Sequence, residues 1–303
     1  MRFDVARIDV KALHDWLLAR LSAGHRTPQA IAQTKKSLDS EAGEAAPDLR
    51  KFLDAGGKQA YMLVTLARFE DLDEGKETQI PDFLYVIPLA AGADERALTK
   101  IFDEPEPKDD PADNGPTKES IQRRKAQSRF GTARIGNSIA VARPGVMKVL
   151  KAGISLARPD LSHALTAAGN APVIWAAAPS DSFRKLVDKQ VNDKDMAEIK
   201  AMRSIVDGVS WAAASLQLRP RSIHVIVQTK SADAATSVQQ AWDQDFSPKP
   251  DPTAGVADRA EQARMIKVFN LLKPVKTGDR LTLDLNKQQI DEIAEVLLPE
   301  FFE

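Results

Sequence analysis

Cysteine is absent from the 303-residue chain, and histidine is scarce. The lack of cysteine excludes disulfides, thiolate nucleophiles, iron–sulfur clusters and cysteine-ligated zinc. It leaves the compartment open, because a protein without cysteine is chemically safe in reducing and in oxidising surroundings. The four histidines are scattered and form no HExxH or HxH pattern; they are His14, His25, His163 and His224. We therefore predict that the protein has no metal site.

Signatures of catalysis and of nucleotide binding are missing as well. The sequence has no GxSxG, no SxxK followed by KTG, no GxGxxG and no GxxxxGK[ST]. The acidic run 109–115 lacks the ligand spacing and the closing glutamate of a calcium loop. A carboxylate pair like that of a glycosidase stays open, because its spacing is spatial rather than sequential. The sequence names no catalytic residue and no cofactor, which favours a protein that is not an enzyme.

Long apolar runs and an excess of charge of one sign are also lacking. The formal net charge is −1, so no overall field attracts nucleic acid or an anionic membrane. No apolar run reaches the length of a transmembrane helix. The basic residues of 118–129 lie beside an acidic linker and have only Phe130 as a neighbouring aromatic, which is typical of a solvated helix. We expect a protein or a small ligand as the partner, and no nucleic acid.

What is present is the composition of an ordinary folded protein. Hydrophobic residues make up 43% and charged residues 28% of the chain, and its length suits two hydrophobic cores better than one. Two proline-rich stretches, 103–117 and 247–254, offer almost no apolar side chain to a core. We predict that both are loops within units, and that the first is disordered.

The second half gives the clearest order of elements. Apolar and alternating runs predict strands at 171–177, 209–218, 223–227 and 281–285. Helical spacing and capping serines predict helices at 180–190, 195–206, 231–242, 258–272 and 287–298. The first six elements follow the order β-α-β-β-α-β, which matches the split βαβ, or ferredoxin-like, arrangement.

The first half is predicted to repeat this order. Strands are expected at 3–10, 60–66, 83–89, 132–135 and 138–142, and helices at 11–21, before Gly56, and at 93–102 and 144–152. Val86-Ile87 followed by Ala93-Asp94 has the same spacing as Val225-Ile226 followed by Ala232-Asp233, which indicates duplication. We therefore predict an α+β fold of two tandem ferredoxin-like units, 1–155 and 156–303, with mainly antiparallel sheets packed face to face.

Aromatic side chains are the candidates for a ligand site. If two such sheets pack face to face, Trp175, Trp211 and His224 are expected between them. Tyr61 and Tyr85 would join them from the first half. The enclosed space is either a dry core or a ligand pocket, and the core is favoured because large aromatic side chains usually serve packing.

Three stretches carry a resemblance to known proteins. Residues 3–10 (FDVARIDV), and 208–211 (GVSW) leading to the helix that begins at 231–235 (SADAA), resemble a group of uncharacterised bacterial proteins. Those proteins are mostly exported and known only as a domain of unknown function. The resemblance implies an extracytoplasmic location and no assigned activity, and a cytoplasmic location is the alternative. Residues 1–4 lack the regions of a signal peptide, so an exported form would carry its signal upstream of Met1.

These observations favour a non-enzymatic, extracytoplasmic binding or interaction protein. The alternative is a ligand-binding protein or an enzyme with its site between the two sheets.

Overall fold

The computed structural model describes the chain in segments, which are 1–23, 28–64, 83–102, 130–152, 158–181, 183–185, 187–188, 197–246, 248 and 255–301. The chain divides into two compact units: unit 1 comprises 1–7 and 44–157, and unit 2 comprises 8–43 and 158–303. Residues 8–43, which the sequence placed with the first half, therefore belong to unit 2. Apart from Pro248, the predicted loops 103–117 and 247–254 lie outside the described residues.

Unit 1 contains five strands, and each pairs antiparallel with its neighbours in the order β4-β5-β3-β2-β1. Its elements are β1 (Arg2–Asp4), η1 (Val5–Arg7), the end of α2 (Pro28–Asp54), β2 (Gln59–Val64), β3 (Phe83–Pro88), α3 (Glu95–Ile101), β4 (Gly131–Ile135), β5 (Ser138–Ala142) and α5 (Pro144–Lys151). The predicted hairpin of 132–135 with 138–142 is confirmed. The helix that begins at Pro144 is also confirmed, as expected for proline at a first helical position.

The sheet of unit 1 is covered on both faces. Ile87 and Ile139 are cross-strand partners on one face, where they pack with Leu98 of α3. On the other face α5 lies over β4 and β5, and Met147 is close to Gly131. The two faces follow from strand geometry, because successive side chains of a strand point to opposite sides.

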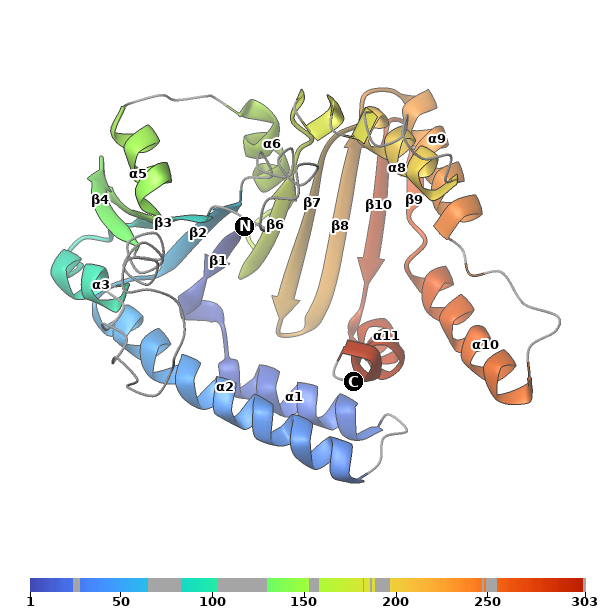
Figure 1. Cartoon of the computed structure of the whole chain (residues 1–303), viewed down its shortest axis with the longest axis horizontal. Coiled ribbons are helices and arrows are strands. Elements are labelled where there is room, and N and C mark those ends of the chain that lie inside the picture. The colour runs from blue at the N-terminus through green and yellow to red at the C-terminus, as the bar shows by residue number, and fades with distance from the viewer. Residues whose placement is uncertain are drawn as a thin grey trace, which may run out of the picture. The chain divides into compact units, whose positions relative to one another are not determined.

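Unit 2 also has five antiparallel strands, in the order β6-β7-β8-β10-β9, and Figure 1 shows β7, β8 and β10 side by side. Its elements are α1 (Val10–Ala23), the start of α2, α6 (Pro159–Ala167), β6 (Val173–Ala177), α8 (Ala197–Gly208), β7 (Val209–Leu218), β8 (Arg221–Thr229), α9 (Ala232–Ala241), the π-helical η3 (Trp242–Phe246), α10 (Val256–Leu271), β9 (Val275–Thr277), β10 (Arg280–Leu285) and α11 (Lys287–Phe301). Ser231 caps α9 by accepting a hydrogen bond from the Ala234 N–H at 3.1 Å, as the sequence predicted.

Two separate clusters fill the two faces of the unit 2 sheet. On one face, Trp211, Ala213 and Ile226 pack with α6, which contacts β6 and β7. On the other face, Leu281 packs with Val238 of α9. The pattern of side chains along β10 explains this second cluster, because its leucines alternate with polar residues and so share one face.

Helix α1 is attached to unit 2 by polar contacts. Asp9 precedes the helix and accepts a hydrogen bond from the Ala12 N–H at 2.9 Å, which caps the first turn. The same carboxylate forms an ion pair with Arg219, between β7 and β8. One turn before its end, α1 pairs Arg20 with Glu295 of α11 at 2.5 Å. These contacts explain why residues 8–43 pack with the second half of the chain.

The strand order corrects the ferredoxin-like prediction. In each unit the first three strands pair in chain order, and the last two form a hairpin that pairs with the third strand. A split βαβ requires parallel strands joined by a crossover, whereas every strand pair within the units is antiparallel. The prediction missed β9, because three residues centred on Lys276 show no alternating pattern. The α+β class and the antiparallel pairing are confirmed, and face-to-face packing of two sheets is not shown.

Candidate functional site

The two tryptophans of the predicted aromatic cluster lie on opposite faces of the unit 2 sheet. Trp211 pairs with Gln228 and is 7% exposed in the cluster beneath α6. Trp175 pairs with Ala214 and is 39% exposed. Ala214 is an odd number of residues along β7 from Trp211, so the register directs the two rings to different faces. The prediction that they share one space is therefore wrong.

The two tyrosines are separated in the same way within unit 1. Tyr85 packs with Phe102 and Phe130, with ring centroids 6.2 and 6.3 Å apart. Tyr61 pairs with Val86, the residue after Tyr85, and therefore lies on the opposite face. The predicted aromatic site does not form within either unit, because strand register rather than residue type decides which side chains meet.

His224 is the candidate that leads to a recognisable arrangement. Its Nδ1 lies 2.5 Å from Oδ1 of Asp284, its cross-strand partner on β10. On the other side, His224 is paired with Ser215 of β7. Cross-strand partners point to the same face, so serine, histidine and aspartate follow one another across three neighbouring strands.

This row has the residue types of a serine hydrolase but not its geometry. A nucleophilic serine must contact its base and be open to substrate. Ser215 is only 6% exposed, and among the described residues no hydrogen bond joins it to His224. The row therefore holds a fixed histidine–carboxylate pair at the surface, where the Asp284 side chain is 77% exposed.

The same sheet face continues across β10 to β9. Arg280 donates from Nε and Nη2 to Oε1 of Gln228, at 3.2 and 3.1 Å. Thr282 donates to the carbonyl oxygen of Val275 at 3.4 Å, and the Val275 side chain itself is 65% exposed. The cross-strand register places all of them on one side of the sheet. We call this surface the open face; it consists of His224, Gln228, Val275, Arg280, Thr282 and Asp284.

The described helices leave only the β10 and β9 side of this sheet face uncovered, because Ile226, the partner of Thr282, and Trp211, the partner of Gln228, are buried in the cluster beneath α6. Helices α9 and α11 are the ones in contact with β8 and β10. Helix α9 packs Val238 on Leu281, and α11 pairs Asp291 with Arg221. Leu281 and Arg221 point away from the open face, to the side of the sheet that carries the leucines of β10, which we call the leucine side. Helix α6 lies over β6 and β7 on the same side of the sheet as the open face, and its cluster extends to Ile226 of β8. The open face thus combines polar pairs fixed by a sheet with one large apolar side chain in solvent.

A second polar cluster, on the leucine side, centres on the buried carboxylate of Asp291 in α11. Trp16 of α1 donates from Nε1 to Asp291 at 2.8 Å, and the cations of Arg20, Arg221 and Lys287 lie 3.7, 3.6 and 3.4 Å from the carboxylate. The Arg221 guanidinium also stacks 5.1 Å from the centre of the Trp16 ring. These groups pair with one another across the two helices, so this cluster joins α1 to α11.

The electrostatics of this cluster stabilise a charged carboxylate. Burial by itself raises the pKa of the Asp291 carboxyl. The Trp16 hydrogen bond and the neighbouring cations outweigh burial, so the pKa lies below its ordinary value. The charge on Asp291 therefore contributes to the stability of the folded state.

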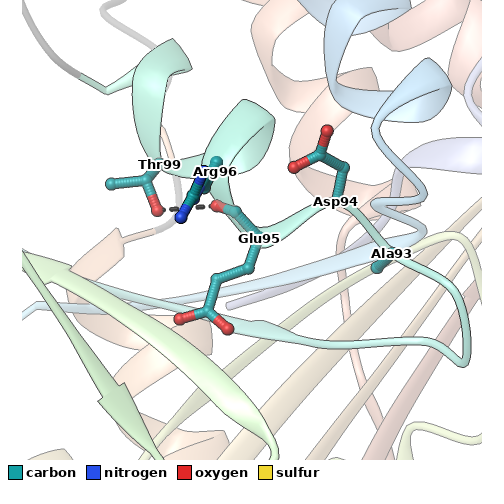
Figure 2. Close-up of a pocket in the computed structure, with 5 residues that line it drawn as sticks. All are labelled: Ala93, Asp94, Glu95, Arg96 and Thr99. Atoms are coloured by element: carbon teal, nitrogen blue, oxygen red, sulfur yellow. Dashed lines mark hydrogen bonds between the residues drawn. The ribbon is translucent and has the colours of Figure 1, made fainter.

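Unit 1 has a shallow hollow at the start of α3, drawn in Figure 2. It measures about 650 Å³ and is lined by one continuous segment, namely Ala93, Asp94, Glu95, Arg96 and Thr99. Asp94 caps the helix by accepting from the Ala97 N–H at 3.0 Å, and Thr99 donates to the Glu95 carbonyl at 2.7 Å. All of its described lining comes from the start of this one helix, where Asp94 and Thr99 bond to the helix backbone and Glu95 pairs with Arg134 of β4, so we assign the hollow no function.

Comparisons with protein-family models, with curated proteins and with solved structures gave no match. Within the described segments, no three histidine, aspartate or glutamate side chains come close enough to hold a metal ion. Nor does any of the helices described here have the length and apolar character needed to cross a bilayer. The argument for function therefore depends on the open face.

Sequence reasoning singled out His224 but missed the rest of the open face. The missed residues are Gln228, Val275, Arg280, Thr282 and Asp284. One signal was present: residues 280–285 read RLTLDL, so arginine, threonine and aspartate alternate with three leucines. Such strict alternation is typical of a strand with one buried and one solvated face.

Proposed function

We propose that the chain is a non-enzymatic binding protein that recognises a protein partner with the open face of unit 2. One observation carries this proposal: on the β10 and β9 side of the sheet face, which the described helices leave uncovered, paired polar side chains lie next to the exposed Val275. An exposed apolar side chain next to fixed polar groups is a combination that protein-binding patches use.

The rigidity of the open face supports binding. His224 is already held by Asp284, and Arg280 by Gln228. Binding therefore orders few side chains, which keeps the entropic cost of association low. The short strand β9 carries Lys276 at its centre, a feature that discourages an added strand at a sheet edge. We therefore place the partner on the sheet face and not along the edge.

The alternative, a ligand site or an active site between two sheets, has less support. It required Trp175 and Trp211 to line the same space, and their strand register directs them to opposite faces. Ser215 is buried and, among the described residues, has no hydrogen bond to His224, so the triad-like row gives the enzymatic alternative no activated nucleophile.

We also propose an extracytoplasmic location, which is supported by the resemblance to mostly exported bacterial proteins. Expression of the gene with its native upstream region, followed by cell fractionation, tests this point. We expect the protein outside the cytoplasm, and recovery only from the cytosol would favour the cytoplasmic alternative.

Site-specific photo-crosslinking tests the binding surface. A photoreactive residue at Thr282 samples the open face, and the same residue at Lys267 is the control, because its side chain on α10 is 67% exposed in the same unit. We expect a discrete protein adduct from position 282 and none from 267. Equal patterns at both positions, or no adduct at 282, would contradict the proposal.

A further inference from the structure

We infer that the open face binds a second copy of this chain, about a two-fold axis that passes beside Thr282. This inference rests on the proposed function, since it names the partner of the same surface. The reason is that the charges and the apolar residue of the open face are arranged symmetrically around Thr282.

The charges on β10 are self-complementary. Arg280 and Asp284 lie on the same face, each two residues from Thr282, with opposite charges. A two-fold interface is isologous: when residue i contacts residue j of the other copy, j also contacts i. Two antiparallel β10 strands that cross at Thr282 bring each Arg280 over the second copy's Asp284. The pairing therefore forms two identical ion pairs.

Both groups have capacity for such a contact. Arg280 uses two of its five N–H donors on the neutral Gln228, and no carboxylate of the described residues lies within ion-pair distance of it. Asp284 uses Oδ1 for His224, and a carboxylate accepts several hydrogen bonds. Docking thus adds a counter-charge to Arg280 without breaking a contact that the single chain already makes.

Val275, on the edge strand β9, fits the same axis. Val275 is the cross-strand partner of Thr282, and it is the most exposed of the large hydrophobic residues in the described segments, at 65%. A two-fold axis beside Thr282 brings the two copies of Val275 close to each other. Because α6 lies over β6 and β7 on the same side of the sheet, the contact is confined to β9, β10 and the adjoining side of β8, and the long arginine side chains reach across it. The interface removes the exposed valine from water.

Charge reversal in mixed variants tests this pairing. In Arg280→Asp, and likewise in Asp284→Arg, each contact joins like charges, so we expect roughly a 100-fold or greater loss of dimer affinity. In an equimolar mixture of the two variants both contacts join opposite charges. We therefore expect a heterodimer, measured by sedimentation velocity with one variant labelled. The double variant Arg280→Asp with Asp284→Arg should dimerise with itself. Circular dichroism of each variant checks that it is folded.

A crosslinking experiment provides independent support. Because the chain has no cysteine, Thr282→Cys introduces a single thiol, and a bismaleimide of about 10 Å matches the spacing of packed sheets. We expect covalent dimers from Thr282→Cys and none from the control Lys267→Cys.

Each further outcome decides between the two proposals. Single variants that lose the dimer without rescue in the mixture overturn the two-fold register. A wild-type chain that stays monomeric overturns self-association. If the photoreactive residue at position 282 then captures a different protein, the proposed function stands, and if it captures nothing, both proposals fail.

Discussion

Unit 1 and unit 2 end their sheets with the same hairpin turn but cover the neighbouring strands differently. The turns are Gly136-Asn137 and Gly278-Asp279, and the glycines have φ of 56° and 62°. A glycine at positive φ followed by a second turn residue that is not at positive φ is typical of a type II′ hairpin. In both units the end of the third strand is hydrogen-bonded to this turn. The Leu89 N–H donates to the carbonyl oxygen of Asn137, and the Thr229 N–H donates to that of Asp279, each at 2.9 Å.

Alignment on the turn glycines shows where the units differ. Ala140 and Ala142 of unit 1 correspond to Thr282 and Asp284 of unit 2, and both alanines are completely buried. Their small side chains let α5 lie over β4 and β5, where it buries Met147. In unit 2 the last helix, α11, lies on the opposite, leucine side. The comparison indicates that side-chain size and charge along one strand decide which face a helix covers.

The shared strand order and turn are what duplication of one unit requires. Duplication stays a prediction. Its sequence signal, the spacing of Val86-Ile87 and Val225-Ile226, falls on the third strand of each unit but is one residue out of register, because Ile139 pairs with Ile87 whereas the corresponding Leu281 pairs with Val227. The open face is then the part of unit 2 in which the common plan was changed. The predictions below test that interpretation, from the largest expected effect to the smallest.

The largest loss of stability is expected when Ala142 of unit 1 is replaced by aspartate, the residue at the corresponding position 284 of unit 2. Ala142→Asp places a carboxylate beneath α5 at a position with no exposure, and we expect a loss of roughly 5 kcal/mol. All four tryptophans belong to unit 2. Tryptophan fluorescence therefore reports unit 2 alone, and circular dichroism reports both units. A urea transition of Ala142→Asp that matches wild type by circular dichroism would show that α5 does not seal this face.

A second contrast lies within unit 2, between the covered and the uncovered tryptophan. Trp211 is packed beneath α6, so Trp211→Ala should cost about 4 kcal/mol through the cavity it leaves. Trp175 is 39% exposed and is the matched control, with an expected loss of about 1 kcal/mol. Urea unfolding followed by circular dichroism measures both. Similar losses for the two variants would mean that the face beneath α6 is loosely packed.

Local signals in the sequence predicted most elements, whereas their arrangement depended on long-range pairing. The strand 209–218 and the cap Ser231 were predicted correctly, because an apolar run and a capping serine act within a few residues. The strand order was not, since pairing joins residues far apart in the chain. The attachment of α1 to unit 2 depends on Trp16 meeting Asp291, and 275 residues separate them. No local pattern encodes that contact.

The candidate site shows the same division. His224 was noticed as a rare residue, but its partner Asp284 was found only through the register of β8 and β10. The separation of Trp175 from Trp211 also follows from register, where a shift of one residue reverses the face. Residue type alone therefore predicted candidates and not their grouping.

The attachment of α1 gives the third prediction, because unit 1 has no counterpart of α1 held on its last helix among the described residues. Asp291→Asn keeps the size of the side chain and removes its charge from three neighbouring cations. We expect a loss of about 2 kcal/mol, as for a hydrogen-bonded charged group. Glu295→Gln is the control, since its side chain is 44% exposed, and it should cost less than about 0.5 kcal/mol. Equal losses of stability for the two variants would contradict the assignment of Asp291 as the main contact between α1 and α11.

The same variant gives a prediction about pH. The folded pKa of Asp291 lies below its unfolded value of about 3.9, so its contribution is complete above the unfolded pKa. That contribution is lost as the pH falls through the folded pKa. The stability difference between wild type and Asp291→Asn should thus be constant from about pH 5 to 8 and shrink below about pH 4. A difference that grows on acidification would reverse the assigned sign.

The smallest effect on stability is expected for Asp284→Ala, which gives unit 2 the residue found in unit 1. The Asp284 side chain is 77% exposed and pairs only with His224 among the described residues. Exposed ion pairs contribute little, so the free energy of unfolding should change by less than about 0.5 kcal/mol. Binding behaves differently, because removal of the carboxylate leaves Arg280 without its counter-charge in the proposed dimer. We expect roughly a tenfold weaker self-association at unchanged stability, measured by sedimentation and by tryptophan-detected urea unfolding. A loss of stability above about 1 kcal/mol would show instead that the open face is structural, and that the polar residues of β10 serve the fold as the alanines of β5 do.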